Sequence, residues 1–305
     1  MTLRALRPGD TLALVSPASP LDADKLPTAT ALLEAEGYRV KPYPHALDRT
    51  AYLAGTDADR AADLMAAFDD PETAAVFCTR GGYGCARLFP HLDLDRIAAS
   101  GKPLIGFSDV TTLHLALNRR GLATIHAPMA LTLHYDRADW VYESFRRVLR
   151  GNLAVPEDAP RAETIVPGVA EGEVLGGCLC LLTDSVGTPE ALETEGKILV
   201  IEDVDEAPHR IDAMLTHLRN SDLLQRCAGI VVGEMTGTDD RVDEGIGGLP
   251  WREIVRDRIA DLGIPTVIDF PFGHAKRGML SLPFGLHARL DADAGTLTYE
   301  RTRSV

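Results

Sequence analysis

The chain has 305 residues and a hydrophobic content of 45%, so it can bury a substantial core, and its length favours two domains over one. Its formal net charge of -14 argues against a nucleic-acid partner, because phosphate binding needs a basic face and the Lys and Arg residues here are dispersed. The first residues lack the apolar core of a signal peptide, and no apolar run approaches the length of a membrane span. We therefore expect a cytoplasmic protein with no membrane partner.

The cysteines indicate free thiols. There are five, an odd count, and although Cys178 and Cys180 lie one residue apart, there are no paired C-x-x-C clusters. This pattern argues against both a disulfide framework and a structural zinc site.

The first half of the chain alternates short β-rich runs with helical stretches. The expected strands are 11–16, 39–43, 74–79 and 102–105, and the expected helices are 27–36, 57–69, 110–117 and 140–150. Such alternation predicts parallel strands joined by helical crossovers. Ligands bind beyond the carboxyl ends of such strands, where the polar loops 16–20 and 79–84 and the turn at Ser108 follow.

The second half begins after a segment rich in Pro, Glu and Asp, residues 151–167, whose composition predicts an extended linker. We accordingly expect one domain over 1–150 and another over 168–305. The second domain should contain strands 198–201, 229–232, 266–268, 286–290 and 296–299, with helices 211–218 and 251–262. The last two strands flank a turn-rich connection and predict a hairpin.

Ser108 is the first candidate catalytic residue. It lies in Gly106–Val110, directly after a predicted strand and directly before a predicted helix. A sharp turn of this kind lifts a serine hydroxyl clear of the sheet and aims backbone N–H groups at whatever it attacks. Two observations oppose this interpretation: serine is also a favoured helix N-cap, and Val110 stands where the hydrolase motif G-x-S-x-G has its last glycine.

A glycine-rich loop, Arg80–Gly84, follows another predicted strand. It fits neither the dinucleotide-binding fingerprint nor the P-loop, so a nucleotide site is not indicated. Adjacent glycines can bring a backbone N–H close to a substrate atom, as one arm of an oxyanion hole. An ordinary turn is an equal alternative.

Four acids, Glu202, Asp203, Asp205 and Glu206, follow the apolar strand 198–201. They could orient a histidine, bind a divalent cation or form a solvated loop. Glu202 is the first of them, so it should be held most rigidly at the strand end. We expect the other three to face water.

His274 is the histidine with the most site-like surroundings, because it follows the predicted strand 266–268 in a loop. His126 is its main rival, whereas His114 falls within the helix after Ser108 and should be packed. Ser108, Glu202 and His274 occur in the order serine, acid, histidine, which α/β-hydrolases also use. Order alone leaves open whether the three meet, because a triad is a spatial arrangement.

These residues resemble the LD-carboxypeptidases of serine peptidase family S66, which also contains the microcin C immunity peptidases. The resemblance extends over nearly the whole chain. It rests on ordered motifs: Pro8–Asp10, Val15–Ser19, Arg80–Gly84 with Arg87 and Leu88, Gly106–Thr111, His126–Met129, Gly176–Gly177, Gly187–Pro189, Glu202–Asp203 with Arg210–Asp212, and Phe272–His274.

The resemblance implies a catalytic triad of Ser108, Glu202 and His274, with the backbone N–H groups of Gly82 and Asp109 as the oxyanion hole. It also implies an α/β fold with a flavodoxin-like, parallel-sheet N-terminal domain, a smaller C-terminal α/β domain of swivelling type, and commonly a homodimer. The chain departs from the family at two places. Cys178 follows Gly176–Gly177 where the family usually has Asn, and Ala127 stands where it often has Gly. Both departures concern the pocket wall.

We therefore expect a serine carboxypeptidase with no metal and no cofactor, which removes the terminal D-alanine from the L,D-linked tetrapeptide of murein during cell-wall recycling. Its partner would be a small peptide or muropeptide. Beside the site motifs, Arg80, Gly81, Tyr83 and Lys276 are candidate substrate contacts, and Arg277 is a further cation for the substrate carboxylate.

Three alternatives remain. An immunity peptidase that cleaves a peptidyl-nucleotide would need an aromatic platform, and neither Trp140 nor Trp251, the two tryptophans, adjoins a site motif. A non-catalytic peptide-binding module could keep the same architecture. A metal hydrolase would use the four acids that begin at Glu202.

Overall fold

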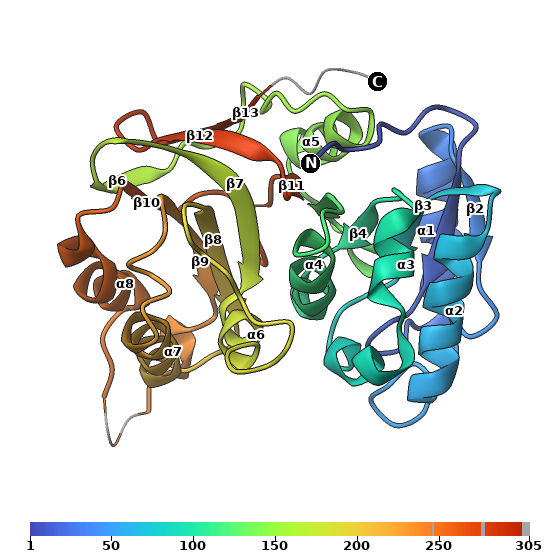
Figure 1. Cartoon of the computed structure of the whole chain (residues 1–305), viewed down its shortest axis with the longest axis horizontal. Coiled ribbons are helices and arrows are strands. Elements are labelled where there is room, and N and C mark those ends of the chain that lie inside the picture. The colour runs from blue at the N-terminus through green and yellow to red at the C-terminus, as the bar shows by residue number, and fades with distance from the viewer. Residues whose placement is uncertain (244, 246, 276–277, 301–305) are drawn as a thin grey trace.

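The computed structural model describes residues 1–243, 245, 247–275 and 278–300. Their strands form two sheets that lie side by side, with the N-terminal half of the chain on the right of Figure 1 and most of the C-terminal half on the left. Within these residues, no helix is both long enough and apolar enough to cross a bilayer.

The first sheet has the strand order β11-β5-β4-β3-β1-β2. Its strands are β1 (Thr11–Val15), β2 (Arg39–Pro42), β3 (Thr73–Cys78), β4 (Leu104–Gly106), β5 (Thr124–His126) and β11 (Leu282–Phe284). Strands β1 to β5 are parallel, as the alternating pattern predicts, whereas β11 returns from the C-terminal half and pairs antiparallel with β5.

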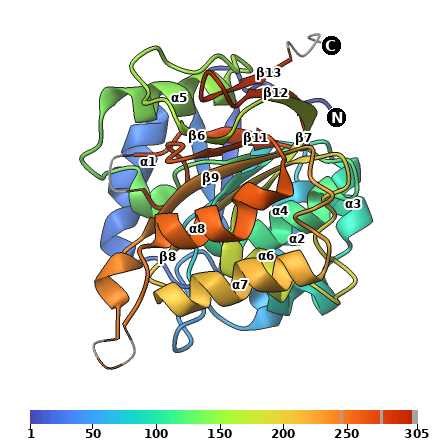
Figure 2. The ribbon, with the colours of Figure 1, turned by 90° about the vertical axis from the view of Figure 1, so that its left-hand side faces the viewer.

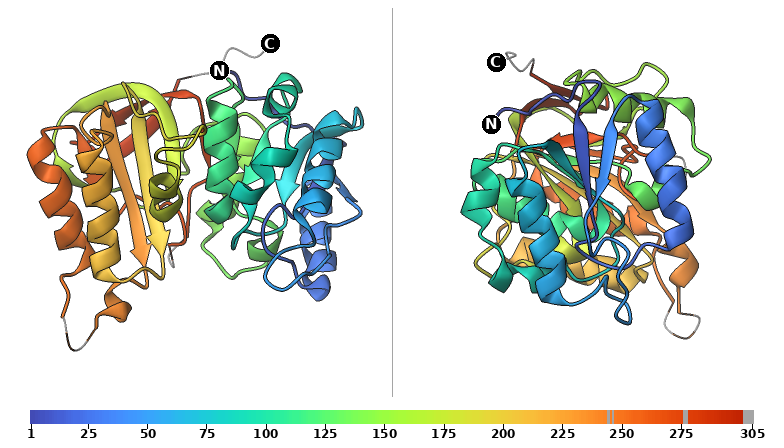
Figure 3. Two further views of the ribbon diagram at one scale, coloured as in Figure 1. Left: turned by 60° about the horizontal axis from the view of Figure 1, so that its bottom comes forward. Right: turned by 90° about the vertical axis from the view of Figure 1, so that its right-hand side faces the viewer.

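Helices cover both faces of this sheet, as the right-hand view of Figure 3 shows for its first helices. They are α1 (Leu26–Ala35), α2 (Asp57–Asp69), α3 (Leu94–Ala99), α4 (Thr111–Asn118) and α5 (Asp139–Leu149). Helices α2, α3 and α4 share one hydrophobic cluster, α1 contributes to another, and α5 contributes to both. Helix α2 spans the predicted residues because Thr56 caps it, its hydroxyl accepting a hydrogen bond from the backbone N–H of Asp59.

The second sheet has the order β13-β12-β7-β8-β9-β10-β6. Its strands are β6 (Glu163–Val166), β7 (Val169–Cys178), β8 (Ile198–Val204), β9 (Gly229–Thr236), β10 (Thr266–Ile268), β12 (His287–Asp291) and β13 (Thr296–Tyr299). Strands β7 to β10 are parallel, and β12 and β13 form the predicted hairpin. Both sheets together confirm the prediction of an α/β protein with mainly parallel strands.

One face of the second sheet is covered by α6 (Leu179–Asp184), α7 (Pro208–Asn220) and α8 (Trp251–Ile259), and Figure 2 shows α7 and α8 in front of it. The opposite face belongs to the cluster that also contains α2, α3 and α4. Strand β7 packs against α4, so the two lobes meet where these elements adjoin (Figure 1).

Four strands, β5, β6, β7 and β11, were not among the expected strands. The segment predicted as a linker contains β6, which pairs antiparallel with β10 at the sheet edge. Strand β7, with ten residues, was not predicted, because Gly172, Gly176 and Gly177 lower its strand propensity. We keep the division into domains 1–150 and 168–305 as a proposal, and the flavodoxin-like and swivelling types stay predictions.

Candidate active site

Ser108 lies in a strained turn between β4 and α4. It begins a short 3₁₀ turn, Ser108–Val110, and its φ of 64° falls in the left-handed region. A residue other than glycine held there costs about 1–3 kcal/mol, which functional sites can store in the way a nucleophile elbow does. The N-cap positions of this turn and of α4 are Phe107 and Val110, so capping does not explain the serine.

The side chain of Asp109 is hydrogen-bonded within the N-terminal lobe. Its Oδ2 accepts a hydrogen bond of 2.8 Å from the backbone N–H of Cys85, and burial raises the pKa of its carboxyl group. The side chain therefore has a structural partner, and only the backbone N–H of Asp109 is a candidate for the oxyanion hole.

The glycine-rich loop contacts the Ser108 turn. A methyl group on Gly81 would lie 2.7 Å from Cβ and 2.9 Å from Oγ of Ser108, so only glycine allows this approach. Gly82 is exposed and has a φ of 108°, and a methyl group there would lie 2.2 Å from Oγ of Ser19. The carboxyl ends of β3 and β4 thus bring the two loops together at one sheet edge.

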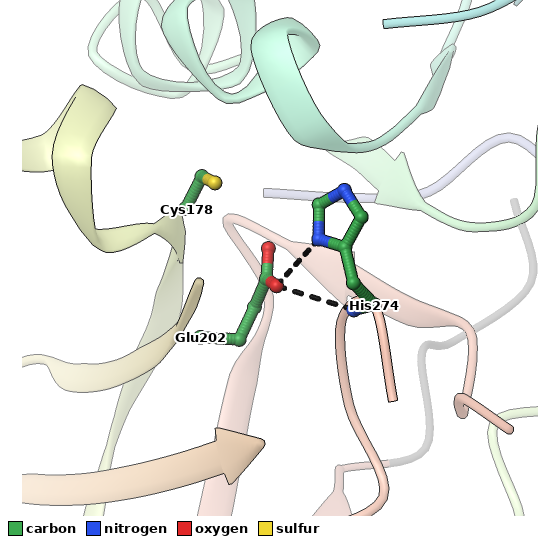
Figure 4. Close-up of side chains that lie close together, drawn as sticks. All are labelled: Cys178, Glu202 and His274. Atoms are coloured by element: carbon green, nitrogen blue, oxygen red, sulfur yellow. Dashed lines mark hydrogen bonds and ion pairs between the residues drawn. The ribbon is translucent and has the colours of Figure 1, made fainter. Parts of the chain in front are cut away.

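Glu202 and His274 form a hydrogen-bonded pair (Figure 4). Oε2 of Glu202 accepts hydrogen bonds from Nδ1 of His274 at 2.7 Å and from its backbone N–H at 3.2 Å. Because a carboxylate only accepts, Nδ1 carries the proton and Nε2 is left to act as a base. The Glu202 side chain is fully buried, which makes this arrangement rigid.

Two local features produce this pair. The register of β8 against β9 shifts between Ile201 and Asp203, and a β-bulge of this kind re-aims the side chain at Glu202. Gly273 has a φ of 81°, and a methyl group there would lie 2.2 Å from Cγ of Glu202. The loop before His274 can therefore wrap the carboxylate only with a glycine at this position.

The pKa of His274 reflects two opposing effects. Burial lowers it, but the negative charge of Glu202 and the hydrogen bond to it outweigh burial, so the pKa lies above its ordinary value of 6.5. The ring of Phe107, the residue before Ser108, packs on His274 with ring centroids 4.9 Å apart. The contact places the serine turn and the Glu202–His274 pair at the same boundary between the sheets.

The rival histidines lie in the core. His126 is fully buried and packs on Phe272 with ring centroids 4.2 Å apart, and burial holds its pKa well below the usual value. Nε2 of His114 lies 2.9 Å from the carbonyl oxygen of Gly106, and burial lowers the pKa of His114 to about 4. Both rings are therefore held neutral at pH 7.

The prediction that Asp203 faces water is wrong. Strand β8 continues to Val204, so Asp203 points to the face opposite Glu202 and is only 1% exposed. Oδ2 of Asp203 accepts a 2.7 Å hydrogen bond from the backbone N–H of Cys180. Burial and the charge of Glu202 raise the pKa of Asp203 to about 6. The acid that does face water is Asp205, whose side chain is 64% exposed.

Cys178 lies beside the pair, on the Glu202 side of His274 in Figure 4. Its hydrogen bond with Cys180, its burial and the neighbouring carboxylates raise the pKa of its thiol well above the usual range. Cys178, which stands where the resembling family usually has Asn, therefore lies directly at the candidate site.

The predicted substrate contacts differ in their surroundings. Nη1 of Arg80 donates to the carbonyl oxygen of Pro20 at 3.2 Å, whereas the ring of Tyr83 is half exposed. Lys276 and Arg277 lie outside the described residues.

Arg137 is a candidate residue that sequence reasoning missed. Its positive charge opposes protonation of His274, and its guanidinium lies 5.4 Å from the ring centroid of Tyr135. Within the described part of the chain, its Nη1 is buried without a hydrogen-bond partner. No motif surrounds it, so only the fold brings it near the site.

A cleft of about 810 Å³ opens beside the serine turn. Tyr83, Asp109 and Thr112 line it from the N-terminal lobe, and Leu181 and Ser185 line it from α6 and the residue after it. It reaches the Ser108 turn through Asp109 and gives room for a bound ligand to extend between the lobes.

Similar proteins share both halves of the chain. Residues 12–127 match the LD-carboxypeptidase N-terminal domain, and residues 171–290 match the LD-carboxypeptidase C-terminal domain. A Bacillus subtilis protein named as a probable murein peptide carboxypeptidase is 36% identical over 97% of this chain and 93% of its own length. The murein tetrapeptide carboxypeptidase of Pseudomonas aeruginosa is 34% identical over 92% of this chain and 93% of its own.

Solved structures agree with these matches. The muramoyltetrapeptide carboxypeptidase of Oxalobacter formigenes superposes with a TM-score of 0.82 and 29% identity, covering 94% of this chain and 97% of that one. The microcin C7 self-immunity protein MccF, solved with aspartyl sulfamoyl adenosine, has a TM-score of 0.86 at 23% identity and covers 99% of each chain, which shows a shared fold. The chain therefore belongs to the peptidase S66 family of LD-carboxypeptidases.

Proposed function

We propose that the protein is a serine LD-carboxypeptidase that hydrolyses the bond to the terminal D-alanine of murein tetrapeptides. The observation that carries the proposal is the 2.7 Å hydrogen bond between Nδ1 of His274 and the fully buried carboxylate of Glu202. A buried acid that fixes the tautomer of a histidine is the arrangement that activates a serine nucleophile. The substrate class comes from the named murein carboxypeptidases among the relatives.

Each residue has a defined role in the proposed reaction. Nε2 of His274 takes the proton from Ser108 as its Oγ attacks the carbonyl carbon, and then gives that proton to the leaving amine. Glu202 holds the imidazole in place and stabilises its cation. The backbone N–H groups of Gly82 and Asp109 stabilise the oxyanion, and water then hydrolyses the acyl-enzyme.

A carboxypeptidase must also recognise a free carboxylate, and we propose Arg137 for this role. A buried guanidinium nitrogen without a partner is costly unless an anion binds it, and the charge of Arg137 already acts on His274. Arg137→Ala should raise KM for a free tetrapeptide at least tenfold but should change KM for the C-terminal amide little. Arg96→Ala, in an arginine that is 61% exposed and paired with Asp69, is the control.

The wild type and Ser108→Ala test the reaction on murein tetrapeptide and on a peptidyl-nucleotide, with the products followed by mass. Loss of one D-alanine with the wild type alone supports the proposal. An intact tetrapeptide together with a cleaved nucleotide conjugate would contradict the proposed function and favour an immunity peptidase.

One observation favours the immunity peptidase as a second candidate function: Tyr83 is a half-exposed ring on the cleft that could stack on a base. The two tryptophans do not support an immunity peptidase, because Trp140 and Trp251 are only 8% and 3% exposed. A non-catalytic peptide-binding module would require that no substrate is cleaved and that a fluorophosphonate probe does not label Ser108. A cytoplasmic location, a homodimer and a part in cell-wall recycling remain predictions.

A further inference from the structure

Two thiols and a carboxylate lie close together beside the Glu202–His274 pair. Cys178 ends β7, and Cys180 lies in the first turn of α6. Their Sγ atoms are 3.8 Å apart, and Sγ of Cys178 lies 3.6 Å from Oδ1 of Asp203. One donor atom from each of the three residues lies within 4.8 Å of the others.

These separations match the edges of a tetrahedral zinc site. Zinc binds sulfur at about 2.3 Å and carboxylate oxygen at about 2.0–2.2 Å, so a tetrahedral angle puts two sulfur ligands about 3.8 Å apart and a sulfur and an oxygen about 3.6 Å apart. The three residues would therefore need little movement to coordinate one ion. Cys180 is partly exposed and gives the ion a route from solvent.

A second observation points to a cation at this place. Oε1 of Glu202 is buried without a hydrogen-bond partner among the described residues, and Figure 4 shows it on the Cys178 side of the carboxylate. Glu202 and Asp203 are also consecutive buried acids, 0% and 1% exposed, and their charges repel each other. Cys178 belongs to both donor groups, with Cys180 and Asp203 and with Glu202 and His274, so a positive ion held by its thiolate would lie next to both carboxylates and weaken their repulsion.

We propose that Cys178, Cys180 and Asp203 form a binding site for one thiophilic divalent cation of the zinc class, next to Glu202, which shares the neighbouring donor Cys178. Binding replaces the two thiol protons, which pass to solvent, and changes no oxidation state. The site adjoins the Glu202–His274 pair through Cys178, but the reaction proposed above uses no metal. If Glu202 acts as proposed, the bound ion inhibits the enzyme, because it competes with His274 for the carboxylate.

Cadmium tests the site directly, because cadmium thiolates absorb in the ultraviolet. Reduced, chelator-treated protein is titrated with Cd²⁺, and we expect a charge-transfer band that saturates at one ion per chain and that Zn²⁺ abolishes. Cys178→Ser and Cys180→Ser should each weaken binding by more than about 100-fold, since losing a group that merely orients a ligand already costs 10–100-fold. Cys227→Ser, in another buried cysteine, should keep the band.

Three results would overturn the proposal. The first is a band that survives in both Cys178→Ser and Cys180→Ser. The second is binding that His274→Ala abolishes and Cys180→Ser does not, which would place the ion at Cys178, Glu202 and His274 instead. The third is an ion that binds, by calorimetry, without any thiolate band and is lost in His45→Ala, which would place it at the cluster of His45, Asp48 and Asp59.

Folding is checked by thermal unfolding of each variant, and Cys180→Ala replaces Cys180→Ser if the serine unfolds the protein. The binding test does not depend on catalysis. Zinc inhibition of the wild type and its loss in Cys180→Ser is a separate result, which fails alone if the proposed function is wrong.

Discussion

The backbone N–H of Cys178 donates a 3.1 Å hydrogen bond to the hydroxyl oxygen of Thr111, which joins the end of β7 to the first residue of α4. A methyl group on Gly177 would lie 2.2 Å from the same oxygen, so the two elements touch without an intervening side chain. Thr111 is three residues after Ser108. This contact therefore fixes the serine turn against the sheet that carries Glu202.

Thr111→Val should destabilise the protein and reduce its activity together. The valine has the size of threonine but cannot accept the hydrogen bond, so the buried N–H of Cys178 is left unpaired, at a cost of about 1–3 kcal/mol. Chemical denaturation measures the loss of stability, and kcat/KM on tetrapeptide should fall because the serine turn is released. Thr216→Val removes a hydroxyl that bonds Asp212 on the half-buried face of α7 and should change neither quantity. Equal behaviour of the two variants would contradict the role of Thr111.

The dependence of kcat/KM on pH should show an acid limb with its midpoint above 6.5. In the proposed mechanism His274 must be neutral to accept the serine proton, and its pKa lies above 6.5 because the charge of Glu202 outweighs burial. Activity is therefore lost as pH falls through this raised pKa. Glu202→Gln removes the charge but not the burial, so the limb should move to lower pH.

The same variant should lose on the order of 10³- to 10⁴-fold in kcat, because the amide no longer selects the tautomer of the histidine. Full turnover by Glu202→Gln would show that another acid orients the histidine. An acid limb that stays in place would show that the limb does not belong to His274.

Gly273→Ala should disrupt the Glu202–His274 pair. The methyl group would lie 2.2 Å from Cγ and 2.4 Å from Cδ of Glu202, so the carboxylate must shift. Positive φ adds a strain of about 1–2 kcal/mol. We expect loss of most activity and a clear fall in melting temperature.

Gly121→Ala is the matched control, because its φ of 80° is close to the 81° of Gly273 and no atom of the described residues lies within 4 Å of the added methyl group. Gly121→Ala should lose stability through the backbone strain but should keep its activity. If both variants lose activity equally, the close approach at Glu202 is not what matters.

Local pattern predicted part of the candidate site. Ser108 stands between an apolar run and a helical periodicity, and His274 lies in the loop after β10, whereas Glu202 was expected after the strand 198–201 but lies within β8, which continues to Val204. Their hydrogen bond could not be predicted, because it depends on the bulge at β8 and on the backbone of Gly273.

Long-range contacts account for what the sequence did not show. Strand β11 is three residues long and is a strand only because it pairs with β5, far away in the chain. The run of acids around Asp203 has the composition of a solvated loop, but Asp203 is buried and accepts a hydrogen bond from α6. Arg137 lies in a loop without a motif, and its charge lowers the pKa of His274. In each case tertiary packing overrides local composition.

Ser108→Gly should be more stable than Ser108→Ala, although both remove the hydroxyl of the proposed nucleophile. The φ of 64° costs alanine about 1–2 kcal/mol, whereas glycine adopts it freely, and the larger entropy of glycine in the unfolded chain reduces the gain to about 1 kcal/mol or less. Denaturant unfolding of the two inactive variants measures this difference. At Ser100, where φ is -65°, the order should reverse, with alanine more stable than glycine. If alanine is also the more stable residue at Ser108, the turn is not strained, and the resemblance to a nucleophile elbow loses its physical basis.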